Sequence, residues 1–269
     1  MRMLKHYQNQ SLPQLAQLLR GEAITFSVLI QILQGECTDI FTDHENVIIC
    51  YSCHPWPVWA WCRDVECEEN VMEIARCLKE HYPLEQGYEI NLRYELLEAL
   101  KKQDGYFQSA KRKLGLLSYR LDQIETLEYP CGGTMGLVRE EEISSLVEVW
   151  QDMHLEMEGR MLTLEHCRDS IQRRAEEKRL YAWRGCDGKI LALTARNDMG
   201  QYSKITSVYT LPKHRRNGYA LNLVHGVTET ILADGLIPIL YTDADYEASN
   251  ECYRKIGYRL VGRLISICK

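Results

Sequence analysis

The segment from Ile205 to Ala220 joins a strand-like run to a helical pattern through a basic turn that contains a glycine. Arg215 and Arg216 stand directly before Gly218 in this turn. The first backbone N–H groups of a helix have no acceptor within it, the helix dipole is positive there, and glycine allows close approach. The two arginines add positive charge. The segment therefore predicts an anion site, for which a diphosphate is the natural ligand.

Two elements must position this turn. The Ile, Thr, Val and Tyr residues around Val208 favour an extended strand, which Leu211-Pro212 ends. The apolar residues after the turn have helical spacing: Ala220, Leu223, Val224, Val227 and Ile231. Asn217-Gly218 is also a hairpin signal, but the helical period that follows favours the start of a helix.

The loop Arg215–Ala220 (RRNGYA) resembles the acetyl-CoA loop of the GCN5-related N-acetyltransferases (GNAT), which reads Gln/Arg-x-x-Gly-x-Gly/Ala. A second block, Leu240–Asp243 followed by Ser249–Tyr258, resembles the fifth strand, fourth helix and helix-ending Gly-Tyr of the FR47-like branch. The resemblance covers residues 134–269, about half of the chain. It implies an α/β (α+β) fold there, in which helices flank a mixed, mostly antiparallel central sheet.

The resemblance also implies acetyl-CoA as co-substrate. Residues of the strand, the loop and the later helix would contact it: Val208, Tyr209, Thr210, Arg215, Arg216, Asn217, Gly218, Tyr219, Ala220, Asn250 and Tyr253. The strand residues would offer backbone hydrogen bonds to the pantetheine arm.

Tyr253 matches the family tyrosine that protonates the departing thiolate, and a phenol with a pKa near 10 suits that task. The alternative role is packing at an interface. Helical spacing predicts that Ala248, Cys252 and Ile256 form the buried stripe, with Tyr253 at its edge. Cys252 has no evident histidine partner, so we expect direct attack by an amine and no covalent enzyme intermediate.

No carboxylate occurs in Ile205–Thr210, although many relatives have a glutamate on this strand. Asp243, at the end of the next predicted strand, is the candidate general base, acting through water, and Asp245 is close in sequence. The alternative for Asp243 is the capping of a turn.

The function predicted is transfer of an acetyl group from acetyl-CoA to an amine of a small molecule or peptide, within a ternary complex. Two alternatives stay open. One is an amino-acid or longer-chain N-acyltransferase, and the other is a non-catalytic acyl-CoA-binding sensor module. The predicted protein is a monomer or a homodimer.

Composition excludes several classes of protein. The chain of 269 residues has 45% hydrophobic and 26% charged residues, which is typical of a globular protein with a substantial core. Its net charge of -6 argues against a nucleic-acid partner. No apolar run approaches the roughly 20 residues needed to cross a bilayer. The N-terminal residues lack the apolar stretch of a signal peptide, which predicts a cytoplasmic protein.

Eleven cysteines without an export signal predict free thiols in a reducing compartment. Cys50 and Cys53 precede His54 with the spacing of a haem attachment site, and Cys62 and Cys67 follow at distances loosely compatible with zinc. Because a second Cys-x-x-Cys pair is missing and apolar strand-like runs contain these residues, we interpret them as core cysteines and predict no metal.

Two domains are predicted, 1–128 and 134–269, separated by a turn-forming stretch. In the first, an α/β domain, strand-like runs at Asp39–Phe41, Val47–Tyr51 and Val58–Arg63 precede a helix at Glu68–His81. Their order raises the hypothesis of a degenerate GNAT-like module. Lys111-Arg112-Lys113 is interpreted as a solvated helix face. Three tryptophans fit packing in the core or at a domain interface, or an acceptor pocket: Trp56, Trp59 and Trp61.

Overall fold

The computed structural model describes residues 4–35, 39–127 and 131–269. Within these ranges, twelve strands form a mixed sheet in the order β1-β2-β3-β4-β5-β12-β6-β11-β10-β9-β8-β7. The mixed α/β fold class is therefore confirmed.

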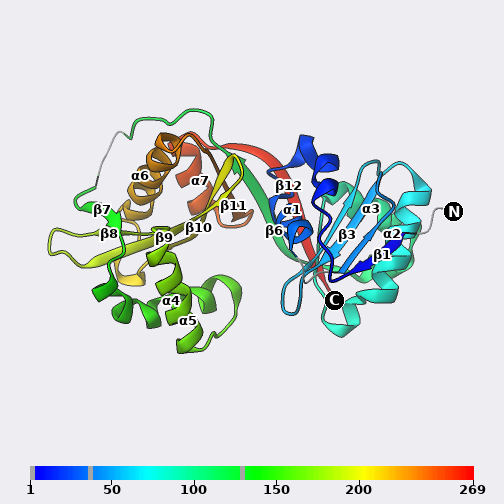
Figure 1. Cartoon of the computed structure of the whole chain (residues 1–269), viewed down its shortest axis with the longest axis horizontal. Helices are drawn as coiled ribbons and strands as arrows, with labels where there is room; N and C mark the ends of the chain where they lie inside the picture. The colour runs from blue at the N-terminus through cyan, green and yellow to red at the C-terminus, as the bar shows by residue number, and fades with distance from the viewer. Residues whose placement is uncertain (1–3, 36–38, 128–130) are drawn as a thin grey trace. The chain divides into compact units, whose positions relative to one another are not determined.

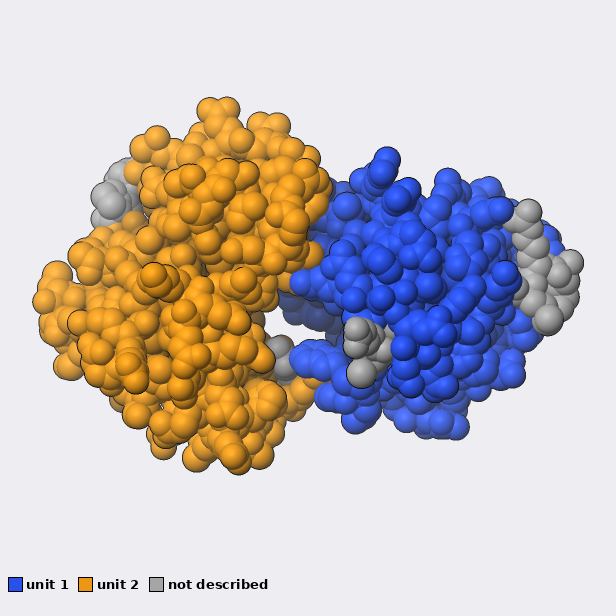
Figure 2. All heavy atoms as spheres, viewed as in Figure 1, with its two compact units in different colours: residues 1–118, 242–246, 260–269 blue, residues 119–241, 247–259 orange. Residues whose placement is uncertain are grey.

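The chain divides into two compact units, drawn in two colours in Figure 2. Unit 1 comprises residues 1–118, 242–246 and 260–269, and unit 2 comprises residues 119–241 and 247–259. Three strands, β6, β11 and β12, have residues in both units. The domain boundaries at 128 and 134 stay a prediction.

Unit 1 begins with an antiparallel run of four strands, to which β5 adds in parallel and β12 antiparallel to β5. Its elements, with two of the three shared strands, are β1 (Lys5–Gln8), η1 (Pro13–Glu22), α1 (Ser27–Gln34), β2 (Asp39–Thr42), β3 (Val47–Tyr51), β4 (Val58–Cys62), α2 (Glu68–His81), η2 (Leu84–Gln86), β5 (Ile90–Leu92), α3 (Tyr94–Gln103), η3 (Gly105–Ser109), β6 (Lys111–Arg120) and β12 (Arg259–Cys268).

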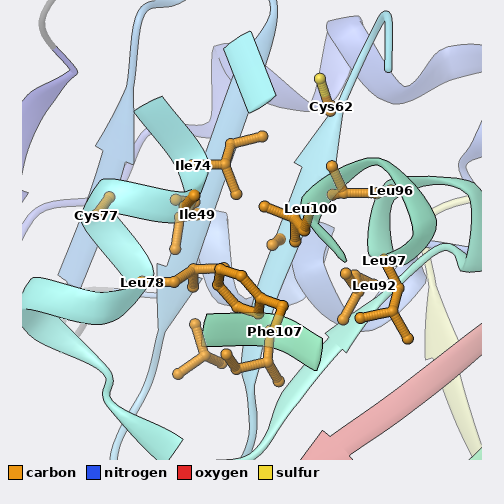
Figure 3. Close-up of a cluster of buried hydrophobic side chains, with 14 of the residues drawn as sticks. Ile49, Cys62, Ile74, Cys77, Leu78, Leu92, Leu96, Leu97, Leu100 and Phe107 are labelled. Atoms are coloured by element: carbon orange, nitrogen blue, oxygen red, sulfur yellow. The ribbon is translucent and has the colours of Figure 1, made fainter. Parts of the chain in front are cut away.

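Strands β3 and β4 are buried on both faces. Val47 and Ile49 pack with α2 and α3, whereas Ile48 and Cys50 pack with η1 and α1. Because successive strand residues point to opposite faces, two covered faces require the continuous apolar runs found here. Figure 3 shows the cluster beneath α2 and α3, which includes Ile49, Cys62 and Phe107.

The same alternation places the predicted cysteines and tryptophans. Cys50 and Cys62 are buried in the two cores, and Trp59 and Trp61 pack together in the cluster beside η1 and α1. Cys53 is exposed and Cys67 is half-buried, so the interpretation of these two as core cysteines is wrong: each follows the end of its strand. Trp56 is half exposed, at 51%. The interpretation of Lys111-Arg112-Lys113 as a helix face is wrong, because these residues begin strand β6.

Unit 2 contains the strand and the helix that the sequence predicts on either side of the basic turn, β10 and α6. The elements are β7 (Thr134–Leu137), η4 (Glu140–Glu142), α4 (Ile143–Glu158), α5 (Leu164–Glu176), β8 (Leu180–Arg184), β9 (Ile190–Met199), β10 (Tyr202–Thr210), η5 (Pro212–His214), α6 (Tyr219–Ala233), β11 (Ile237–Asp243) and α7 (Glu247–Ile256). Strands β7 to β10 pair antiparallel, and β10 pairs with β11 in parallel.

Helices cover both faces of this part of the sheet, with α4 and α5 on one face and α6 on the other (Figure 1). On β9, Leu193 and Ala195 belong to the core beneath α4 and α5. Arg196, next along the strand, points to the opposite face and pairs with Asp234 at the end of α6 (2.6 Å). Among the described residues, none of the helices is long and apolar enough to span a bilayer.

Replacing Phe107 with Ala should destabilise unit 1. The ring is fully buried among α2, α3 and β4 side chains, and removal of such a ring leaves a cavity that costs about 3–5 kcal/mol. Urea titration followed by fluorescence measures the free energy of unfolding. Met72→Ala, on the exposed side of α2 at 61%, is the matched control and should change it by less than about 0.5 kcal/mol.

Candidate active site

Strand β10 contains a bulge. Thr206 pairs with Ala195 and Tyr209 pairs with Leu193, so Ser207 and Val208 together lie opposite the single residue between those partners. The backbone of Ser207 is left-handed there, with φ of 53°. A bulge of this kind leaves one residue out of the ladder and bends the strand.

The other edge of β10 opens next to the bulge. Parallel pairing with β11 runs from Tyr202 and Ile237 to Ile205 and Leu240, and in the described ranges no register continues past that pair. Both strands nevertheless continue past this pair, β10 to Thr210 and β11 to Asp243. The N–H and C=O groups of an unpaired strand edge can bind an extended amide chain. We call the point after Ile205 and Leu240 the fork.

The basic turn forms a concave loop of backbone before α6. Arg216 and Gly218 both have positive φ, 64° and 78°, and Gly218 is the N-cap of the helix. The side chain of Asn217 donates to the backbone carbonyls of His214 (3.1 Å) and Arg215 (3.0 Å), which fixes the turn. The helix begins at Tyr219, so its first N–H groups lack helical acceptors here. The predicted start of a helix is confirmed.

The Arg215 side chain is held by an acidic residue that the sequence did not indicate. Its guanidinium donates to Glu156 of α4 (2.6 Å) and to the Thr210 carbonyl (3.1 Å), and it lies 5.3 Å from the Tyr209 ring centroid. Tyr209 also donates to Glu156 (3.2 Å). The hydrogen bond from Arg215 lowers the pKa of Glu156 below its usual value.

A cavity of about 290 Å³ lies beside this network. Residues of α4, the end of β10 and η5 line it: Val149, Asp152, Tyr209, Leu211, Pro212, Lys213 and His214.

Helix α7 presents a different face from the one predicted. Asn250, Tyr253 and Ile256 are its buried residues, and Ala248 is exposed. The predicted stripe of Ala248, Cys252 and Ile256 is therefore wrong in part. Its error was to assume that apolar residues alone face inward, whereas the polar Asn250 and Tyr253 are 1% and 5% exposed.

Other tyrosines surround Tyr253. Its ring centroid lies 6.4 Å from that of Tyr119 and 6.2 Å from that of Tyr258. The Tyr119 hydroxyl donates to the side-chain oxygen of Asn250 (3.4 Å), which connects the two polar residues of the helix. Tyr258 is itself hydrogen-bonded to Thr228 (2.9 Å).

Asp243 ends β11 and is half-buried. Its carboxylate accepts a hydrogen bond from the backbone N–H of Asp245 (2.9 Å), which is the turn-capping contact. Asp245 in turn binds Arg112 (2.8 Å). The role of Asp243 as a base stays a prediction.

The thiol of Cys252, next to Tyr253, is poorly suited to act as a nucleophile. Burial raises the pKa of Cys252 to about 12, so this thiol carries very little thiolate at neutral pH. In the described ranges, no group of three His, Cys, Asp or Glu side chains is placed to hold a metal ion.

A protein-family model matches the part of the chain that contains most of this site. Residues 173–264 match the model of the FR47-like protein family, and this span contains the bulged strand, the basic loop and α7. No curated protein matches the chain.

Solved structures match nearly the whole chain at low identity. A GCN5-related N-acetyltransferase from Sphaerobacter thermophilus is 14% identical, with a TM-score of 0.71, and the match covers 98% of this chain and 94% of that one. A GNAT-family acetyltransferase from Colwellia psychrerythraea is 12% identical, with a TM-score of 0.63 and 98% of both chains covered. A Drosophila protein is 12% identical, with a TM-score of 0.67, and the match covers 100% of this chain and 99% of that one.

The fold is therefore that of the GNAT acetyltransferase superfamily along the whole chain. Within this fold, residues 173–264 are the part similar to the FR47-like family model.

Replacing Gly218 with Ala tests the loop before α6. Because φ is positive there, any residue with a side chain should lower the free energy of unfolding by about 1–2 kcal/mol. The added Cβ would meet no protein atom closer than 3.7 Å. The strain would alter the backbone of the loop that presents the first N–H groups of α6, so we expect coenzyme A affinity to fall about tenfold in calorimetry. Gly235→Ala has the same strain (φ of 74°) at the far end of α6 and should leave affinity unchanged. An equal loss of coenzyme A affinity in both variants would contradict the interpretation of the loop before α6 as the anion site.

Proposed function

We propose that this protein is an acetyl-CoA-dependent N-acetyltransferase that acts on an amine of a small molecule or peptide. One observation carries the proposal: the bulged, open-edged strand β10 leads within one continuous segment to the N-terminus of α6. A coenzyme A thioester has an extended amide chain joined to a pyrophosphate. Strand edge and helix N-terminus are the two receptors that such a molecule needs.

Different residues would bind different parts of the coenzyme. Val208, Tyr209 and Thr210 offer backbone groups along the open edge to the pantetheine amides. The backbone from Arg216 to Ala220, with Arg215 and Arg216, receives the pyrophosphate. When bound, the coenzyme supplies an acyl carbon activated as a thioester. Asn250, on the buried face of α7, is the side chain of that helix proposed to contact the coenzyme.

The chemistry that we propose is direct attack of the acceptor nitrogen on the acyl carbon. A backbone N–H at the bulge stabilises the developing oxyanion, because an N–H outside the ladder is free to do so. Tyr253 gives its phenolic proton to the departing sulfur. The raised pKa of Cys252 supports a ternary complex over an acyl-cysteine route.

Thiol release from acetyl-CoA across a panel of amines tests the function. Release that depends on an amine supports it, and calorimetry of coenzyme A shows whether the site binds at all. Tight binding without turnover for any amine would indicate the acyl-CoA sensor module. Faster release from longer acyl-CoA thioesters, or with amino acids as acceptors, would indicate the alternative N-acyltransferase. Cytoplasmic location and a monomer or homodimer stay predictions.

Replacing Tyr253 with Phe should lower kcat by about 100-fold without weakening coenzyme binding, because the buried ring remains and only the proton donor is lost. Thiol release and calorimetry measure the two effects. Tyr258→Phe is the matched control: it removes a buried hydroxyl bound to Thr228 and should cost about 1 kcal/mol of stability with kcat retained. A Tyr253→Phe enzyme with an unchanged rate across pH would exclude the general-acid role.

A further inference from the structure

Lys204 is a buried lysine in the middle of β10 that the proposed chemistry does not yet use. Lys204 is only 8% exposed, whereas lysine side chains are rarely buried in proteins. It pairs with Asn197 of β9 and Ile239 of β11. Directly paired residues share a face, and so do residues two apart on a strand. Lys204 therefore lies on the face of Thr206 and Tyr209, the face that α4 and α5 cover.

The amino group of Lys204 lies at the fork. Its nitrogen is 5.7 Å from the ring centroid of Tyr241, the first residue of β11 after the last paired residue, Leu240. The bulge begins three residues after Lys204 on the same strand. An acyl group carried along the open edge of β10 would end close to this amine.

The charges on β9 next to Lys204 point away from it. Arg196 and Asp198 lie on the α6 face, where they bind Asp234 (2.6 Å) and Ser203 (2.6 Å). The titratable and charged groups on the side of the sheet covered by α4 and α5 include Tyr209, Tyr241, Asp152, His154, Glu156 and Arg174. Glu156 is occupied by Arg215 and Tyr209.

Burial disfavours the charged form of an amine. It lowers the pKa of Lys204 to about 8, so a substantial fraction of this side chain is neutral at slightly alkaline pH. A neutral amine is a proton acceptor. The strand thus holds a base although it lacks a carboxylate.

We propose that Lys204 is the general base that deprotonates the acceptor amine. This inference rests on the acyl transfer proposed above. The acceptor ammonium gives one proton to neutral Lys204, directly or through one water, and its nitrogen lone pair forms the C–N bond to the acyl carbon. The C–S bond breaks and Tyr253 gives its proton to the sulfur. The new amide nitrogen loses its second proton to the tyrosinate, and Lys204 releases its proton to solvent.

Lys204→Arg is the sharpest test, because it keeps the positive charge and a long side chain but cannot be deprotonated in this pH range. We expect kcat to fall about 100-fold, the contribution typical of a general base, with coenzyme A affinity within about threefold of wild type. Wild-type kcat/KM should rise with pH around the pKa of Lys204, and Lys204→His should move that rise to lower pH. Lys189→Arg, whose side chain is 80% exposed, is the matched control with unchanged kcat.

A second readout needs no turnover. Trace labelling of the coenzyme-free protein with acetic anhydride at several pH values, followed by peptide mass spectrometry, gives the pKa of each lysine. Lys204 should titrate with a pKa of about 8, below the ordinary range of a lysine, because its side chain is buried. A normal pKa for Lys204, or a Lys204→Arg enzyme with wild-type kcat, would overturn the proposal. A wild-type protein that binds coenzyme but never releases thiol would instead overturn the proposed function.

Discussion

The interrupted hydrogen-bond ladder of β10 is the constraint on which the rest of the site depends. Backbone N–H and C=O groups in a protein interior need partners, and a central strand normally finds them on both neighbours. Here the antiparallel ladder with β9 skips a residue and the parallel ladder with β11 ends at Ile205 and Leu240. Protein side chains bind two of the remaining carbonyls, Thr194 that of Thr206 and Arg215 that of Thr210. Other backbone groups at the interruption can bind water or a ligand, so the strand at the centre of the sheet also forms part of the candidate binding site.

The surrounding packing makes such an interruption tolerable. Helix α6 on one face and helices α4 and α5 on the other hold β8, β9 and β10 in register, so the sheet does not need the missing bonds to keep its shape. The left-handed residues Arg216 and Gly218 then turn the chain sharply enough that α6 starts next to the open edge. The open edge of β10 could bind an extended amide chain and the N-terminus of α6 a pyrophosphate. These two sites are close in space because they are close in sequence.

That adjacency explains which parts were predictable from the sequence. The loop 215–220, the strand before it and the helix after it are local patterns, as are β3 and α2, whose predicted bounds match the structure. Glu156 lies 59 positions before Arg215, and no local pattern connects them. The buried face of α7 was misjudged for a related reason. Only tertiary contacts, such as that between Asn250 and Tyr119, make a polar residue the inward one.

Lys204 shows the same limit in a sharper form, because a lysine in a strand is ordinarily interpreted as a solvated residue. Strand periodicity alone places it on the face of Thr206, but its pKa depends on how completely neighbouring elements exclude water, a property of the folded chain. A carboxylate in this position would be a weak base unless burial raised its pKa, whereas burial lowers that of an amine. In both cases burial moves the pKa of the group closer to neutral pH, where a general base works best. The absence of an acid from β10 therefore does not by itself argue for a non-catalytic protein.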